Sequence, residues 1–317
     1  MDIRAAVRVM LLLRLGPGKN CLPIQRVRSL DTPAPIEYSL PLILRDQTKS
    51  CAPPTFRGKV VSAIKPLSRE FHAGKRWLRY DGYSFTAADT ICPLVLQEVT
   101  RAMLSLPIAF IPQKDAFVLV ALQGLVQGKN LLVTADGRWR SGYIPAHYRS
   151  HPFLLATSAD NQQVLCVNED SGLIVDGNDG EPFFEEGGNL TPAVSEILTF
   201  LTQIASNRQS TAQICAQLQQ YQLLQPWPIT VQAAAGPHNV EGLYRIDEPA
   251  LNRLPADDLM ALRDSGALLT AYCQLLSMQH LPALTRVLVH EQQLATKPMP
   301  KELDLDFLND SGNITFG

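Results

Sequence analysis

One short stretch of the sequence, Asp136–Phe153, concentrates side chains that could recognise a charged group. Its 18 residues include Trp139 and Tyr143 together with Arg138 and Arg149. A guanidinium group over an aromatic ring forms a cation–π pair, and it can also donate two parallel hydrogen bonds to a carboxylate or a phosphate. The stretch is therefore a candidate binding surface for an anionic group.

A second aromatic and basic cluster lies upstream at Lys75–Tyr80 and contains Trp77 and Arg79. The two clusters together could line one pocket. The candidate binding residues are Trp77, Arg79, Arg138, Trp139, Tyr143, His147 and Arg149. An alternative interpretation stays open, in which the rings fill the core of a β-structure and the arginines lie at its rim.

The dipeptide Asp136-Gly137 predicts a tight turn, because glycine tolerates the positive φ that such a turn needs. Side chains alternate between the two faces of a strand, so Arg138 and Trp139 should point in opposite directions after this turn. We expect the large Trp139 ring to be buried. Arg138 should then lie outside, near Arg149.

The sequence patterns that could bind a metal ion or catalyse a reaction are weaker than the two aromatic and basic clusters. His147 and His151 are four residues apart, but the glutamate of a zinc-protease helix does not stand between them, and two prolines bracket the segment. The acidic residues of 170–186 do not follow the order of a calcium-binding loop. The glycines of Gly124–Gly128 have the wrong spacing for a dinucleotide-binding loop. The sequence predicts no catalytic residue, no metal site and no cofactor.

Composition narrows the class of protein. The chain is 46% hydrophobic and 18% charged with a net charge of −2, which excludes a disordered polar protein and predicts no nucleic-acid partner. No apolar run approaches the roughly 20 residues of a membrane-spanning helix, and Val9–Leu13 is too short for a cleavable signal peptide. A cytoplasmic location is favoured over a surface-associated one. The six cysteines form no close pair, so we expect reduced thiols.

Residues 1–58 differ from the rest of the chain. They hold nine Lys/Arg and four Asp/Glu, a net charge of +5, and seven of the 23 prolines. We predict a poorly ordered basic N-terminal extension, because this density of proline leaves little room for a helix or a central strand. In a second interpretation, translation starts near Val60.

Residues 59–317 are predicted to form one domain, which is β-rich over 59–190 and α-rich over 191–317. The fold class is α+β, with a mixed, mostly antiparallel β core, flanking helices and a helical C-terminal part. Strands are predicted at 60–64, 107–111, 117–122, 130–134, 153–156, 164–168, 172–176, 228–233 and 242–246. Helices are predicted at 92–103, from Thr191 through Ile204, from Ser210 through Tyr221, and at 255–264, 268–277 and 282–294.

Several separate motifs resemble the SapC family of bacterial proteins over about residues 59–316. These motifs are Pro66–Trp77, Leu106–Phe110, Gln127 with Asn130, Asp136–Trp139, Gly142–Ala146 with Arg149 and Pro152-Phe153, Gly242–Glu248, Ser265–Leu268 and Tyr272–Met278. The resemblance implies a link to a paracrystalline bacterial surface layer and to serum resistance, and it implies no established reaction. A permease subunit of a peptide importer bears the same name, but a permease needs several apolar spans that this sequence does not have.

Two functions of different classes follow. The first is a non-enzymatic accessory or binding protein associated with the envelope or surface layer, with envelope or surface-layer proteins as partners. The second is a soluble enzyme or small-molecule-binding protein that acts on an anionic ligand through Arg138, His147 and Arg149. The weakness of the catalytic patterns favours the first.

Removal of residues 1–58 should leave the stability of the fold unchanged. A chain that begins at Lys59 is expected to unfold cooperatively with a free energy of unfolding within about 1 kcal/mol of the full chain, the scatter of a neutral surface change. Thermal and urea denaturation of the two chains side by side would measure this. Loss of cooperative unfolding in the shorter chain would show that the extension packs on the core.

Overall fold

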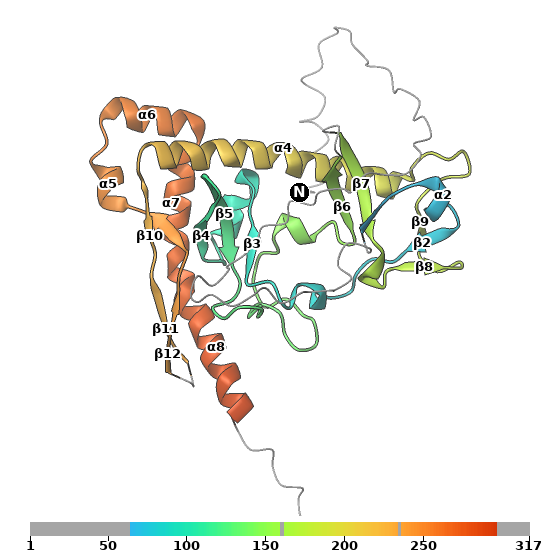
Figure 1. Cartoon of the computed structure of the whole chain (residues 1–317), viewed down its shortest axis with the longest axis horizontal. Helices are drawn as coiled ribbons and strands as arrows, with labels where there is room; N and C mark the ends of the chain where they lie inside the picture. The colour runs from blue at the N-terminus through green and yellow to red at the C-terminus, as the bar shows by residue number, and fades with distance from the viewer. Residues whose placement is uncertain (1–63, 159–161, 234–235, 297–317) are drawn as a thin grey trace, which may run out of the picture. The chain divides into compact units, whose positions relative to one another are not determined.

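Antiparallel strands and helices alternate along residues 64–158, 162–233 and 236–296, which are the residues that this computed structural model describes (Figure 1). The predicted α+β class is confirmed: every strand pair in the described residues is antiparallel, and the C-terminal part is helical. The predicted N-terminal extension lies outside the described residues.

The largest sheet has five strands in the order β10-β13-β4-β5-β3. Its strands are β3 (Ile91–Pro93), β4 (Ile108–Gln113), β5 (Ala116–Leu122), β10 (Leu224–Pro226) and β13 (Tyr244–Ile246). The β4–β5 hairpin forms its centre, with Ile108 paired to Ala121 and Gln113 to Ala116. Because β10 and β13 come from the part of the chain predicted to be α-rich, both parts of the chain share one sheet.

The described residues also form three smaller sheets. Their strands are β1 (Ile64–Pro66), β7 (Gln163–Asn168) and β6 (Phe153–Thr157) in one sheet, β8 (Ile174–Asp176), β2 (Lys75–Trp77) and β9 (Glu181–Pro182) in the second, and β11 (Ile229–Ala233) with β12 (Gly236–Val240) in the third. Four of them, β6, β7, β8 and β11, fall on predicted strand runs, because alternating apolar residues between turn residues are a strong local signal, whereas β2, β9 and β12 were not predicted.

The α-helices are α2 (Arg69–His72), α3 (Val99–Ala102), α4 (Pro192–Gln220), α5 (Glu248–Asn252), α6 (Ala256–Ser265), α7 (Ala267–Ser277) and α8 (Leu281–Thr296). The 3-10 turns are η1 (Ser84–Thr86), η2 (Leu96–Glu98), η3 (Ala146–Tyr148), η4 (Glu169–Ser171) and η5 (Met278–His280). The predicted break between α6 and α7 occurs at Gly266, whose φ of 84° ends one helix in the left-handed region.

Three local predictions need correction. The helix expected over 92–103 is a strand, a 3-10 turn and the four-residue α3, because Cys92 pairs with Ala121 in the sheet. The two helices expected around Ser210 are one 29-residue helix, α4. Its start at Thr191 is predicted correctly, since the Thr191 hydroxyl accepts a hydrogen bond from the Val194 N–H and so caps the helix. The strand expected over 130–134 is reduced to a single bridge between Val133 and Trp139.

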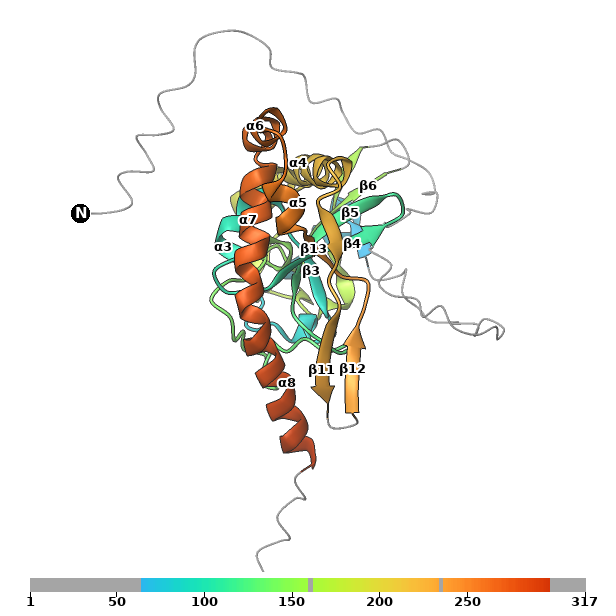
Figure 2. The same ribbon diagram turned by 90° about the vertical axis from the view of Figure 1, so that its left-hand side faces the viewer.

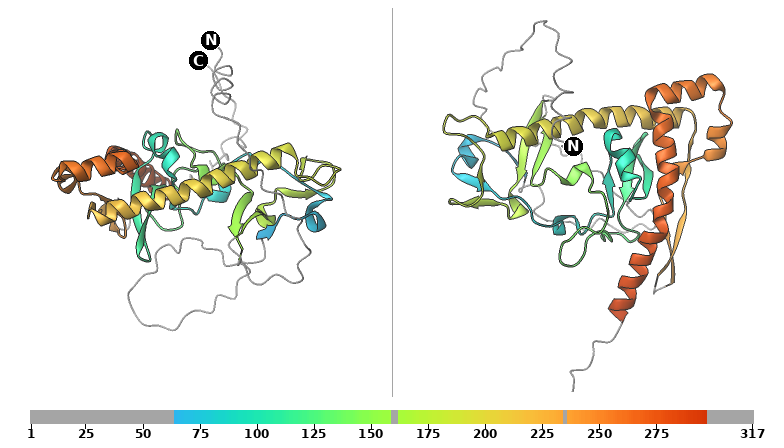
Figure 3. Two further views of the ribbon diagram at one scale, coloured as in Figure 1. Left: turned by 90° about the horizontal axis from the view of Figure 1, so that it is seen from above. Right: turned by 180° about the vertical axis from the view of Figure 1, so that it is seen from behind.

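Helix α4 packs on two sheets at once (Figures 1 and 3). Its N-terminal half contributes Val194 and Leu201 to an apolar cluster with Trp77, Phe153 and Phe183. The C-terminal half contributes residues 214, 215 and 218 to the main core on the five-stranded sheet. Between these halves, residue 204 packs in a third, small cluster. The middle of α4 is therefore held from both ends.

Helices α7 and α8 follow one another, and α8 lies beside β11 (Figure 2). Two buried polar residues of α7 complete the hydrogen bonds of the main sheet. Gln274 accepts from the Ile246 N–H and donates to the Ile108 carbonyl, at 2.9 and 3.1 Å, and the Ser277 hydroxyl accepts from the Ile108 N–H at 2.9 Å. These bonds explain why Gln274 and Ser277 stand on the buried face of α7, since a buried backbone group needs a partner.

The four cysteines of the described residues, Cys92, Cys166, Cys215 and Cys273, are all buried free thiols. Burial raises the pKa of the Cys215 thiol to about 12 and that of Cys166 to about 11. The thiolate is therefore scarce near neutral pH, and these side chains act as small apolar groups.

His72, the last residue of α2, is fully buried and faces Glu169 of η4. Its Nδ1 lies 3.2 Å from the Ser68 carbonyl oxygen, and its Nε2 lies 3.6 Å from Oε1 of Glu169, which also pairs with Lys65 and Lys75. Burial lowers the pKa of the imidazole below its ordinary 6.5. The neutral ring is therefore the form that fits the fold.

Stability should decrease as the pH falls below about 6.5, because the unfolded chain then binds a proton that the buried His72 ring resists. This one site contributes a slope of at most about 1.4 kcal/mol per pH unit. His72→Gln is expected to flatten the dependence of the unfolding free energy on pH, measured by urea denaturation between pH 5 and 8. An identical slope in wild type and His72→Gln would contradict this.

Candidate functional site

A buried carboxylate organises the region around η2 and the loop 142–149. Glu98 is 5% exposed, and three donors bind its two oxygens. The Val95 N–H donates to Oε1 at 2.9 Å, while the Tyr143 hydroxyl and the Ala146 N–H donate to Oε2 at 2.9 and 2.7 Å. Charge-assisted hydrogen bonds of this kind offset the cost of removing the carboxylate from water. They also fasten the loop 142–149 to η2.

Arg149 lies against Tyr143 on the outer side of this carboxylate. Its guanidinium carbon is 5.1 Å from the centre of the Tyr143 ring, and Nη2 donates to the Tyr143 hydroxyl at 2.6 Å. Nε and Nη2 also donate to the Ile144 carbonyl, at 3.1 and 2.9 Å. These contacts hold the exposed guanidinium in one orientation. Burial, followed by the negative charge of Glu98, raises the pKa of Tyr143.

A cavity of about 140 Å³ opens beside these residues, between η2–α3, the loop 142–149 and the middle of α4. Its lining residues are Val95, Gln97, Glu98, Arg101, Tyr143, Ala146, Arg149, Phe200, Gln203, Ile204 and Asn207. The floor is apolar, and amide side chains and two guanidinium groups surround it. Arg101 on α3 is exposed and forms no ion pair with any residue that the structure describes.

A cluster of aromatic rings adjoins the loop 142–149. Trp139 is partly buried against the main core, its Nε1 donates to the Tyr143 carbonyl at 2.9 Å, and its ring centre is 5.4 Å from that of Tyr83. Phe85 stacks on His151 with ring centres 3.8 Å apart and planes 7° apart. The further members of the cluster are Tyr80 and Tyr148. Tyr80 and Tyr148 lie in the two predicted clusters but were not among the candidate residues, whereas Tyr83 and Phe85 were not predicted at all, although the ring-rich run at 80–85 points to them.

Polar side chains beneath this cluster are also paired. The amide group of Asn130 donates to Oε1 of Gln123 at 3.0 Å, and the Tyr148 hydroxyl lies 2.9 Å from the same oxygen. Gly124 is required here, because a Cβ at this position would lie 1.9 Å from the Lys129 carbonyl oxygen. The Lys129 carbonyl therefore lies too close to residue 124 for any side chain at that position.

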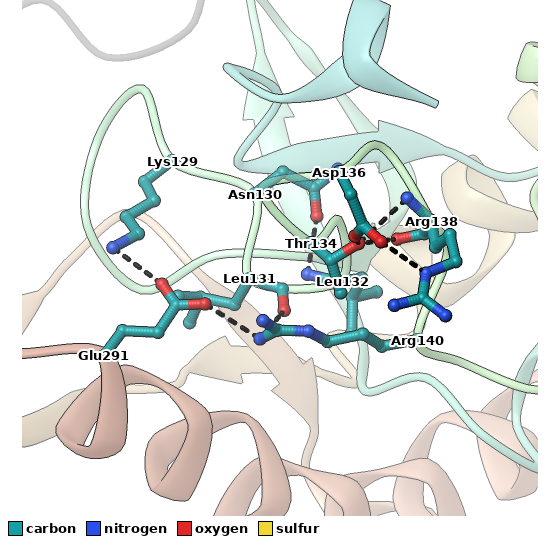
Figure 4. Close-up of polar contacts among 9 residues, drawn as sticks. All are labelled: Lys129, Asn130, Leu131, Leu132, Thr134, Asp136, Arg138, Arg140 and Glu291. Atoms are coloured by element: carbon teal, nitrogen blue, oxygen red, sulfur yellow. Dashed lines mark hydrogen bonds and ion pairs between the residues drawn. The ribbon is translucent and has the colours of Figure 1, made fainter. Parts of the chain in front are cut away.

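Arg138 lies outside the cavity. Its Nε pairs with Asp136 at 2.6 Å, its side chain is 81% exposed, and Thr134 completes the turn by bonding to Asp136 (Figure 4). The turn at Gly137 has the predicted positive φ, 79°. In the same view Arg140 and Lys129 both pair with Glu291 of α8, at 2.8 and 2.7 Å.

Trp77 and Arg79 belong to another part of the fold. Trp77 is 2% exposed, and its ring packs edge to face on Phe153 with centres 5.0 Å apart. Arg79 lies over the Trp77 ring at 5.4 Å and pairs with Glu181 at 2.7 Å. Neither residue lines the cavity at Arg149. Of the seven candidate residues, the structure brings Tyr143 and Arg149 together in that cavity, with Trp139 directly behind Tyr143.

The two histidines of 147–151 do not share a ligand site. His147 Nδ1 lies 3.3 Å from Nη2 of Arg208 on α4, while the His151 ring stacks on Phe85. Within residues 64–158, 162–233 and 236–296, no group of three or more His, Cys, Asp or Glu side chains is arranged to hold a metal ion.

Comparison with known families identifies the chain. The family model SapC matches residues 67–284, more than two thirds of the sequence. The chain belongs to the SapC family. No curated protein and no solved structure shows significant similarity to it. In this SapC-family chain, the motif Gly142–Ala146 supplies two of the three donors to Glu98, and Tyr272–Met278 supplies Gln274 and Ser277 to the main sheet.

No membrane-spanning helix occurs in the part of the chain that the structure describes. None of its helices combines the length and the apolar character that crossing a membrane requires.

Glu98→Gln should destabilise the protein by about 1–3 kcal/mol. The new amide group would face a hydrogen-bond donor at its nitrogen, where the carboxylate oxygen now accepts a hydrogen bond. Urea denaturation would measure the change in unfolding free energy. Glu181→Gln is the matched control, since Glu181 forms an exposed pair with Arg79 that contributes at most about 1 kcal/mol. Equal effects of the two substitutions would refute the organising role of Glu98.

Proposed function

We propose that this SapC-family protein is a non-enzymatic binding protein, an envelope or surface-layer accessory of the kind that the family resemblance implies, and that it holds an anionic group of its partner in the cavity at Arg149. The proposal is carried by one observation: two guanidinium groups, those of Arg101 and Arg149, line the same cavity. The Glu98 carboxylate in that cavity already accepts hydrogen bonds from other groups of the protein.

The charge balance of the cavity supports an anionic ligand. Glu98 is the one acidic residue of its lining, and hydrogen bonds from the protein occupy both of its oxygens. Arg149 uses Nε and Nη2 for the loop, whereas its Nη1 donates to none of the described residues, and Arg101 forms no ion pair with them. Arginine donors of this kind match the oxygens of a carboxylate or phosphate.

The ionisable groups that line the cavity support binding rather than proton transfer. A general acid or base works best when its pKa lies near the working pH. Burial and the Glu98 charge raise the pKa of Tyr143, so this hydroxyl stays protonated. The guanidinium groups of Arg101 and Arg149 are permanently charged. The cavity therefore presents fixed donors and a fixed positive charge.

NMR titration with succinate and with inorganic phosphate would test the proposal. We expect at least one probe to bind the wild-type protein and to bind Arg149→Gln and Arg101→Gln at least about tenfold more weakly, because each change removes charged hydrogen bonds. Arg138→Gln is the matched control, since Arg138 is exposed and lies outside the cavity. Thermal melting checks that the variants are folded.

Two results would overturn the proposal. One is the absence of binding of either probe to the wild-type protein. The other is equal binding by Arg149→Gln and Arg138→Gln, which would place any anion site elsewhere.

A further inference from the structure

We infer that the anionic group is the C-terminal carboxylate of a peptide chain, so that the cavity at Arg149 captures the end of a protein or peptide. This inference rests on the proposed function and names the ligand class of the same site. Three features of the cavity carry it: its size, its ring of amide side chains, and its apolar floor.

The size of the cavity fits one end of a longer molecule. Its volume of about 140 Å³ is well below the roughly 300–1,000 Å³ of pockets that enclose a drug-sized ligand. The cavity is also open to solvent along one side, where Arg101 and Gln203 are exposed. A terminal residue can enter it while the rest of the chain continues outward.

The amide side chains distinguish a peptide from a simple anion. Gln97 and Gln203 are exposed at the cavity and form no hydrogen bond with their side chains in the described part of the structure. Asn207 donates through Nδ2 to the Gln203 carbonyl, which leaves its Oδ1 as an acceptor. A carboxamide offers both donors and an acceptor, as a peptide group does, whereas a fully ionised phosphate offers only acceptors.

The apolar floor fits the side chain of a terminal residue. Val95 and Ile204 are buried and Phe200 is partly buried, and together they form the third, small apolar cluster with Ala146. An aliphatic side chain placed on this floor removes apolar surface from water, which contributes roughly 25 cal/mol per Å². Inorganic anions gain nothing from such a surface.

The arrangement of charges favours a terminal carboxylate over a side-chain carboxylate. In a C-terminal residue the carboxylate, the peptide N–H and the side chain all branch from one Cα, so one residue can reach Arg149, Gln203 and the floor together. In an aspartate or glutamate within a chain the side chain itself carries the carboxylate, so the same residue has no aliphatic side chain left to cover the apolar floor. The site therefore selects a free chain end.

Fluorescence anisotropy with a fluorescein-labelled tetrapeptide that ends in leucine would test this inference on the full chain. The peptide with a free C-terminal carboxylate is expected to bind at least tenfold more tightly than the same peptide with a C-terminal amide, and at least tenfold more tightly than succinate in competition. Gln203→Ala should weaken peptide binding about threefold or more without changing the affinity for succinate. Gln213→Ala, an exposed position further along α4 and outside the cavity, should change neither.

The outcomes separate this inference from the proposed function. If succinate binds and depends on Arg149 but the acid and amide peptides bind equally, the chain-end inference is wrong and the anion site stands. If phosphate binds more tightly than the acid peptide, the ligand is a phosphate group and the inference is also wrong. If neither peptide nor small anion binds, both proposals fail.

Discussion

The buried carboxylate of Glu98 is the interaction on which the candidate site depends. It joins η2 to the loop 142–149 through the Tyr143 hydroxyl and the Ala146 N–H, and it also accepts from the Val95 N–H at the start of η2. A buried charge is tolerated only when several donors compensate it, so the loop cannot move away without leaving the carboxylate unpaired. Arg149 then takes its orientation from Tyr143 and from the Ile144 carbonyl. The buried Glu98 carboxylate thus sets the position of the exposed Arg149 guanidinium group.

Helix α4 supplies the opposite wall of the cavity, and its length explains why that wall is rigid. The apolar residues of its two ends pack in separate clusters on different sheets, and Ile204 and Phe200 lie between them. The Thr211 hydroxyl of the same helix accepts from the Leu96 N–H at 2.8 Å, which ties η2 to α4. All three walls of the cavity are therefore connected by buried hydrogen bonds or by apolar packing.

The arginines described above differ in whether their side chains pair with a carboxylate or with neutral acceptors. Arg79, Arg138 and Arg140 are each paired with a carboxylate. Arg140, which follows the turn at 134–138, connects this part of the chain to α8 through Glu291. Arg149 is held by neutral acceptors, which orient it without neutralising its charge. A cation held in this way keeps its attraction for an external anion, and this distinguishes Arg149 from Arg79, Arg138 and Arg140.

Local patterns in the sequence determined the α+β class, most strands, the start of α4 at Thr191, the α6–α7 break at Gly266 and the turn at Gly137. Each of these depends on neighbouring residues and on the intrinsic geometry of glycine, proline and alternating apolar side chains. Tertiary structure alone decided that Cys92 joins a strand, that α4 runs through Ser210 unbroken, and that Trp77 and Arg79 lie apart from Arg149. The cavity itself combines residues from 95–101, 143–149 and 200–207, which are distant in sequence. No local pattern records that Glu98 is buried beneath Tyr143, because that depends on which segments the fold packs together.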